Sequence, residues 1–191
     1  MRIGYLPLIA KGGGVIGKVF DWQSTTKIID ETLKLFKNIG AEVSYINNPI
    51  NDIEDWNNSG DLFIKDKVEA LFVHTLNISG GENLYEIAKS LKVPVIIAAV
   101  PEPESLHEPP YTSRYASFCG AQWNTNMLFL ADIKSRFIFG LPTENKFREE
   151  LKTIISTINA VNVLKNWKVC VVGDKTPGYY GAIFSEDKLM R

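Results

Sequence analysis

The 191-residue sequence is poor in the residues that build metal centres and disulfide frameworks. It holds only two cysteines, Cys119 and Cys170, and only two histidines, His74 and His107. Such a sparse set supplies neither a structural zinc site nor a disulfide network, so we expect a reduced, cytoplasmic, metal-poor chain. Both cysteines lie in apolar stretches, and we expect them to be buried as small hydrophobic residues.

An excess of one charge and long hydrophobic runs are also missing. The 21 Lys and Arg residues nearly balance the 22 Asp and Glu residues, which gives a formal net charge of -1. A chain with this balance has no overall field that attracts nucleic acid or an anionic membrane. No apolar run approaches the roughly 18–20 residues of a membrane helix, and no charged-then-apolar leader precedes the first strand. We therefore expect neither a membrane nor a nucleic acid as partner.

Short β-branched runs alternate with amphipathic stretches along the chain, a pattern typical of a parallel α/β sheet. It predicts a three-layer, flavodoxin- or Rossmann-like sandwich with a mainly parallel sheet of about five or six strands. The expected strands cover 3–10, 42–46, 70–75, 94–100, 136–140 and 168–174. The expected helices cover 28–39, 52–67, 84–91, 116–134 and 147–167. We expect residues 1–173 to form this domain, with 174–191 a linker and the opening of a second, missing domain.

Ligands of parallel α/β sheets gather at the carboxyl ends of the strands, so the loops there are the places to search. The loop after the first strand contains Gly12-x-x-x-x-Gly17-Lys18, but Val19 stands where a phosphate loop needs Ser or Thr. Without that hydroxyl the loop lacks a magnesium ligand, which argues against a nucleoside triphosphate. The loop is either a flexible connection or a glycine segment whose amides approach a polyol or phosphate.

Three further features have both a chemical and a structural interpretation. The loop 101–115 collects three glutamates and His107, and a solvated acidic loop is favoured over a metal or acid/base site. His74 ends a buried strand, where it either faces a ligand or satisfies a backbone carbonyl. Gln122, Trp123 and Asn124 combine amides with an aromatic ring, as sugar sites do, or they form an ordinary polar helix start.

The order of several motifs resembles the N-terminal region of the L-fucose/L-arabinose isomerase superfamily. These motifs are Leu71-Phe72-Val73-His74-Thr75, Cys119-Gly120-Ala121-Gln122 with Phe139-Gly140, Trp167 to Asp174, Gly178-x-x-Gly181 and Asp187-x-x-Met190. The resemblance covers essentially the whole chain. It implies an aldose–ketose sugar isomerase with a manganese-type divalent ion, whose metal ligands and acid/base carboxylates lie in domains beyond this chain. It therefore implies no catalytic residue, no metal and no isomerase activity in this chain alone.

In the family, the N-terminal domain supplies assembly and a few sugar contacts. Carried over by position, the contacts would be Lys11, Gly13, Lys18, His74, Gln122, Trp123, Asn124 and Pro177. The resemblance also implies a sugar substrate and a homo-oligomer. Two alternatives stay open: a non-catalytic sugar- or phosphate-binding α/β module, and a flavodoxin-like nucleotide binder, against which the missing Ser/Thr-rich phosphate loop counts.

Overall fold

The sheet of this protein is parallel throughout, as the sequence predicts. The computed structural model describes residues 1–9, 22–46, 53–80, 82–102, 115–168, 170 and 173. Within these residues five strands form one sheet in the order β2-β1-β3-β4-β5, and every neighbouring pair is parallel. The strands are β1 (Arg2–Leu8), β2 (Glu42–Ser44), β3 (Ala70–Thr75), β4 (Val95–Ala99) and β5 (Ser135–Phe139).

Helices follow each described strand, which completes the predicted α/β alternation. They are α1 (Trp22–Asn38), α2 (Ile53–Asp66), α3 (Glu82–Leu91), α4 (Ser117–Leu130) and α5 (Asn145–Lys165). The helix expected over 116–134 ends earlier, because the chain turns at Ala131 and Asp132 takes a left-handed φ of 56°. Most of the sixth strand expected over 168–174 lies outside the described residues, as do all of 174–191, so both expectations stay predictions.

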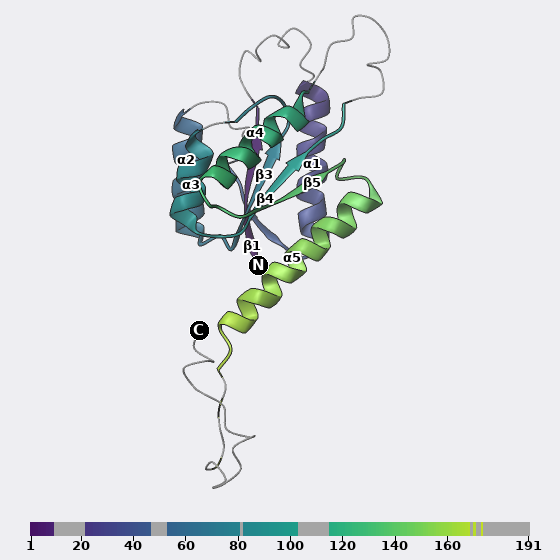
Figure 1. Ribbon diagram of the computed structural model, residues 1–191. Coiled ribbons are helices and arrows are strands. Elements are labelled where there is room, and N and C mark those ends of the chain that lie inside the picture. The colour runs from purple at the N-terminus through teal and green to yellow at the C-terminus, as the bar shows by residue number, and fades with distance from the viewer. Residues whose placement is uncertain are drawn as a thin grey trace, which may run out of the picture. The chain divides into compact units, whose positions relative to one another are not determined.

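Helices lie on both faces of the sheet (Figure 1), and an apolar cluster fills the space under each helical layer. On one face, Phe36 of α1 and Leu151 of α5 pack with Tyr5 and Phe72 of the sheet. On the other face, residues of α2, α3 and α4 pack against Leu71, Val73 and Ile97. The sequence specifies this arrangement directly, since β3 and β4 are buried at every position and a parallel strand with two buried faces must be apolar throughout.

The chain divides into two units, Met1–Asn159 and Ala160–Arg191. The whole described sheet and both apolar layers belong to the first unit. In the second unit α5 continues to its end at Lys165. None of the described helices is long and apolar enough to cross a membrane.

The start of α4 is locked onto the end of β3 by a buried polar cluster. The Ser117 hydroxyl donates to the carbonyl of Thr75 and accepts from the backbone N–H of Val100 at 2.8 Å. About two turns later, the Asn124 amide nitrogen donates to the Ser79 carbonyl at 3.0 Å. Ser117 and Asn124 are both buried, so these bonds form without competition from water.

Gly120 allows this close approach. A Cβ built on Gly120 would lie 2.6 Å from the Asn77 carbonyl oxygen, 2.7 Å from the Thr75 methyl group and 3.0 Å from the Ser79 nitrogen. Two of these three neighbours are backbone atoms, which cannot rotate away as a side chain can. Any side chain at this position therefore has to push α4 off the loop that follows β3.

We expect Gly120→Ala to destabilise the fold by about 1–3 kcal/mol, because the added methyl group overpacks the junction between α4 and the β3 loop. Gly60→Ala is the matched control: Gly60 lies within α2, and its Cβ would meet Ile87 at an ordinary 3.5 Å. That helix-interior change should be neutral or stabilise by up to about 1 kcal/mol. Urea unfolding of both variants measures the difference, and equal effects at the two glycines would contradict the packing argument.

Candidate functional site

Four strands end at the same level, so their carboxyl ends form one line along the sheet, which we call the carboxyl edge. Leu8 pairs with Thr75, Thr75 with Ala99, and Ala99 with Phe139, so β1, β3, β4 and β5 all end on one line. In sheets of this strand order, the point where the chain direction along the sheet reverses lies between β1 and β3. The loops that leave this edge are therefore the first place to look for a ligand site.

His74 lies one residue before the end of β3 and is fully buried. Its Nδ1 is 3.2 Å from the Tyr5 hydroxyl and 3.4 Å from the Thr32 hydroxyl. The Thr32 hydroxyl already donates to the Ile28 carbonyl at 2.7 Å, so it can only accept from the imidazole. The Nε2 atom is buried without a hydrogen-bond partner among the described residues.

Burial sets the charge of this group. Desolvation lowers the pKa of His74 to about 3, because the described surroundings of the buried imidazole are aromatic rings and hydroxyl groups. Burial likewise raises the pKa of the Tyr5 phenol well above its usual value. At neutral pH the site therefore presents a neutral imidazole, which can donate or accept one hydrogen bond through Nε2.

A cavity of about 520 Å³ opens at the same edge of the sheet, between α1 and the loops that follow β4 and β5. This volume lies within the range of small-molecule sites and is large enough for a monosaccharide. Its wall is formed by polar and apolar side chains from three separate segments: Ser24, Lys27, Ile28, Glu31, Pro101, Glu102, Tyr115, Leu141, Pro142, Thr143 and Glu144.

The polar wall of this cavity is mainly acidic. Among its described residues, three are glutamates and only Lys27 carries a positive charge. The Glu144 carboxylate lies over Gly140, whose φ of 142° is one that glycine adopts readily and whose Cβ would sit 2.6 Å from that carboxylate. Carboxylates and hydroxyls of this kind accept hydrogen bonds from the hydroxyl groups of a polyol.

Glu102 shapes the cavity as well as lining it. Its carboxylate accepts the backbone N–H of Ala116 at 2.6 Å and of Tyr115 at 3.0 Å, just before α4 begins. Ala116 is held in the left-handed region, with φ of 47°, and offers no side-chain cap to the helix. A carboxylate bound to two backbone amides stabilises that unusual turn, so this glutamate of the acidic loop is an internal support for α4. Residues 103–114 of the same loop lie outside the described residues.

The three predicted sugar contacts on α4 do not share one face. Asn124 is buried and bonded to the β3 loop, whereas Gln122 and Trp123 are exposed. Consecutive residues of a helix differ by about 100° in direction, so the three side chains leave α4 in different directions. None of the three lines the cavity, and neither does His74. The predicted contacts Lys11, Gly13, Lys18 and Pro177 lie outside the described residues.

The prediction that both cysteines are buried is wrong. Cys119 and Cys170 are both exposed, and neither forms a disulfide. For Cys119 the reason is the character of α4, whose apolar residues surround the helix instead of marking one buried side, so apolar neighbours did not indicate burial.

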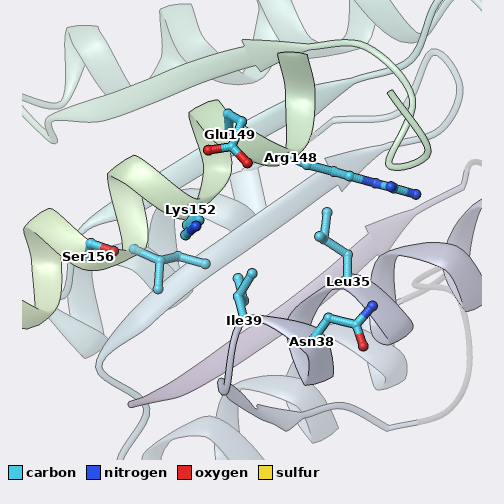
Figure 2. Close-up of a pocket in the computed structure, with 8 residues that line it drawn as sticks. Leu35, Asn38, Ile39, Arg148, Glu149, Lys152 and Ser156 are labelled. Carbon is cyan, nitrogen blue, oxygen red and sulfur yellow. The ribbon is translucent and has the colours of Figure 1, made fainter. Parts of the chain in front are cut away.

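A second hollow, of about 460 Å³, lies between the last turn of α1 and the first half of α5 (Figure 2). Leu35, Ile39 and Ile155 provide apolar surface, with Arg148 and Lys152 among the charged residues around it. The Arg148 Nε donates to the Pro142 carbonyl at 2.8 Å, which ties down part of the guanidinium group. Because α1 runs back from the carboxyl edge, its last turn lies away from the strand ends where ligands of this fold bind.

The described residues do not offer a metal centre. Three glutamates line the cavity, yet no three His, Cys, Asp or Glu side chains in the described part of the chain lie close enough together to hold a metal ion. The sequence signal that could have found the cavity was weak. The cavity wall comes from α1 and from the loops that follow β4 and β5. Of its residues only Glu102 belongs to a motif that is conspicuous in the sequence.

Comparison with known families gives a direct match. A family model described as the fucose/sulfoquinovose isomerase N-terminal domain matches residues 16–165. That range contains all five described helices, four of the five described strands and every lining residue of the cavity.

Curated relatives carry the name sulfoquinovose isomerase. Those of Priestia aryabhattai and Priestia megaterium are each 24% identical over 172 residues, which cover 90% of this chain and 38% of the relative. A third, from Alkalicoccus urumqiensis, is 25% identical over 123 residues, which cover 63% of this chain and 27% of the relative. The chain therefore spans less than two fifths of the length of these relatives.

The buried His74 makes a pH-dependent contribution to stability. The unfolded chain protonates this histidine near pH 6.5, whereas the folded chain resists protonation down to about pH 3. The contribution is thus complete above pH 6.5 and is lost as the pH falls toward 3. We expect the free energy of unfolding to fall by about 1 kcal/mol between pH 7 and pH 5.5 from this group.

Urea unfolding across that pH interval measures the slope. His74→Leu should flatten it whatever the variant does to stability at pH 7, and His107→Gln, which changes the other histidine, should leave it intact. An equally steep decline in His74→Leu would assign the effect to other groups.

Proposed function

Because the chain belongs to the family of fucose/sulfoquinovose isomerase N-terminal domains, we propose that it is the sugar-contacting and assembly domain of an aldose–ketose isomerase. The observation that supports this most strongly is the family match, which spans the whole cavity wall and every described strand except β1. A cavity of monosaccharide size at the carboxyl ends of parallel strands is where this fold places small ligands.

We propose that the complete enzyme is of the metal-dependent L-fucose/L-arabinose isomerase type. A manganese-type divalent ion would polarise the oxygens of an open-chain sugar when bound. The described residues do not fit such an ion, since no suitable group of three ligands exists among them. In line with the family resemblance, we propose that the metal and the proton-transferring groups belong to other parts of the complete enzyme, and we assign no chemical step to them here.

The residues of this chain have binding and orienting roles in the proposal. Glu31 and Glu144 accept hydrogen bonds from sugar hydroxyls, and Lys27 donates one to a sugar oxygen. Tyr115, largely buried in the cavity wall, provides apolar surface for the C–H groups of the sugar. Glu102 keeps the loop before α4 in place through its bonds to two backbone amides.

The charge of the cavity bears on the kind of sugar. With three carboxylates against one ammonium group among the described lining residues, the cavity favours an uncharged polyol over an anionic group. We propose that the hydroxyl-bearing part of the sugar enters this cavity. A sulfonate or phosphate group would need cations from elsewhere, and Lys11 and Lys18 of the loop after β1 are the candidates that the sequence offers.

We expect no isomerase turnover from the purified 191-residue chain in the presence of manganese, because no acid/base pair or metal centre is assigned to it. The measurement is the conversion of L-fucose and of sulfoquinovose to their ketoses, followed by NMR. A homologous full-length isomerase serves as the positive control. Turnover by the chain alone would place catalytic groups within these residues and contradict the proposal.

Sugar binding to the same chain tests the cavity itself. We expect Glu144→Gln to weaken the binding of L-fucose by about tenfold, because a carboxylate acceptor is stronger than an amide by about 1–1.5 kcal/mol. The matched control is Glu149→Gln, in the hollow between α1 and α5. Backbone amide shifts in an NMR titration report both the affinity and the location. Shifts that cluster away from residues 24–31 and 140–144 would reject this cavity as the sugar site.

A further inference from the structure

α4 is a helix without charge. Its sequence from Ser117 to Leu130 contains no Asp, Glu, Lys or Arg, although charged residues make up 23% of the chain. Only part of it is buried: the face that contacts the sheet contains Ser117, Gly120, Ala121, Asn124 and Leu128. A helix that is apolar on all sides is normally covered on all sides, so the outward half of α4 lacks a partner among the described residues.

The outward half carries large apolar side chains. Phe129 and Leu130 are 77% and 76% exposed, and Trp123 is 56% exposed. Phe118 and Phe139 are nearly half exposed, and their rings meet edge to face with centroids 5.8 Å apart. Phe118 meets Phe137 of β5 in the same way, so the apolar surface continues from α4 onto the edge strand. We call this surface, formed by these six residues, the α4–β5 face.

Among the described residues the edge of β5 is also open, although Arg136 on this strand forms an ion pair with Glu150. Within the described residues β5 pairs only with β4, which leaves its other side without a strand. The opposite edge of the sheet is β2, which is three residues long and carries the ion pair between Arg2 and Glu42. Proteins blunt exposed edges by shortness and charge, and only the β2 edge shows both devices.

The α4–β5 face supplies a large part of the area that a standard interface buries on each partner. Its exposed apolar side chains offer on the order of 500 Å², since each aromatic side chain can bury roughly 150–250 Å². A standard interface needs about 800 Å² from each partner, and the amide side chains between these rings add to the apolar area. An uncharged, aromatic centre is also the composition that distinguishes interface cores from other surfaces.

The shape of the face indicates which partner fits. A hollow of about 510 Å³ lies on the β5 side of α4, lined by Phe118, Gln122, Thr125, Asn126, Phe129 and Phe137. It combines aromatic walls with amide groups, which suits an indole ring and its N–H donor. Trp123 follows Gln122 directly, so its side chain leaves the helix about 100° away and does not line its own hollow.

We propose that the α4–β5 face is a two-fold interface between two copies of this chain, in which Trp123 of each copy enters the hollow of the other. A two-fold axis requires a surface to be complementary to itself, and this face carries both the projecting ring and the hollow that fits it. Its lack of charge removes the repulsion that like charges would create across such an axis. This interface would be the surface through which the assembly domain of the proposed function associates, whichever sugar the cavity binds.

Sedimentation velocity of the 191-residue chain over a range of concentrations tests the interface. Trp123→Glu and Phe129→Asp should each weaken self-association about thirtyfold or more, because each places a charge in the centre of an apolar contact. The matched control is Ile64→Asp on α2, which charges an equally exposed apolar residue off the face, at 55% exposure, and should leave association unchanged. Circular dichroism establishes that each variant is folded.

A second measurement needs no variant of the face itself. Cys119 is exposed on α4, so in a Cys170→Ser background its reaction with a thiol reagent reports the covering of this helix. We expect the reaction to slow about tenfold or more from the dilute to the associated chain. A chain that stays monomeric at high concentration overturns the proposal and leaves the face to another partner.

The remaining outcomes are equally clear. The chain could also associate although neither Trp123→Glu nor Phe129→Asp weakens the association and Cys119 reacts at a constant rate. That result would overturn the α4–β5 face as the interface, while self-association through another surface would stand. Quenching of Trp123 fluorescence by sugar, with no change in association, would make α4 a sugar surface and also overturn the proposal. The first result leaves the sugar titration of the cavity unaffected. The second would appear in that titration as amide shifts on α4, so the location of the sugar is read separately from self-association.

Discussion

The close contact between α4 and the end of β3 is the constraint on which the functional edge of the molecule depends. Ser117 joins the Thr75 carbonyl to the Val100 amide, so one hydroxyl ties the ends of two neighbouring strands to the start of a helix. Gly120 permits the approach, and Asn124 extends it to the loop after β3. Because all these groups are buried, the junction is rigid only while every hydrogen bond is made. The cavity beside it takes its shape from the same junction, since Glu102 fixes the turn into α4 and lines the cavity wall.

The parallel sheet could be predicted from the sequence because burial on both faces leaves a strong pattern. Residues 70–75 and 94–100 are apolar almost throughout, as a central parallel strand with two buried faces requires. The helices α1 and α3 could be predicted equally well, since their apolar residues recur at helical spacing on one side. α4 was harder to interpret. Its apolar and amide residues point in every direction, so the sequence could not indicate which of Gln122, Trp123 and Asn124 would be inside.

The candidate site was less predictable than the fold for a physical reason. A cavity wall is assembled from residues that the fold brings together, and here Lys27, Glu102 and Glu144 come from three segments separated by some forty residues or more. No local pattern links them. The acidic loop after β4 is conspicuous in the sequence for its number of carboxylates. The role of Glu102, however, depends on the left-handed turn at Ala116, which composition alone does not reveal. His74 is conspicuous in the sequence as a histidine within an apolar strand, but it does not line the cavity.

The two proposals meet in one helix, and this has a consequence for how the domain works. The inner side of α4 is bonded to the strand ends, its first turn is held by a residue of the cavity wall, and its outer side is the face proposed to meet a second copy. A rigid element that touches both regions transmits a displacement from one to the other, because packed interiors do not absorb small shifts. Association through Trp123 and Phe129 would therefore restrain the turn that Glu102 supports, and with it the wall of the sugar cavity.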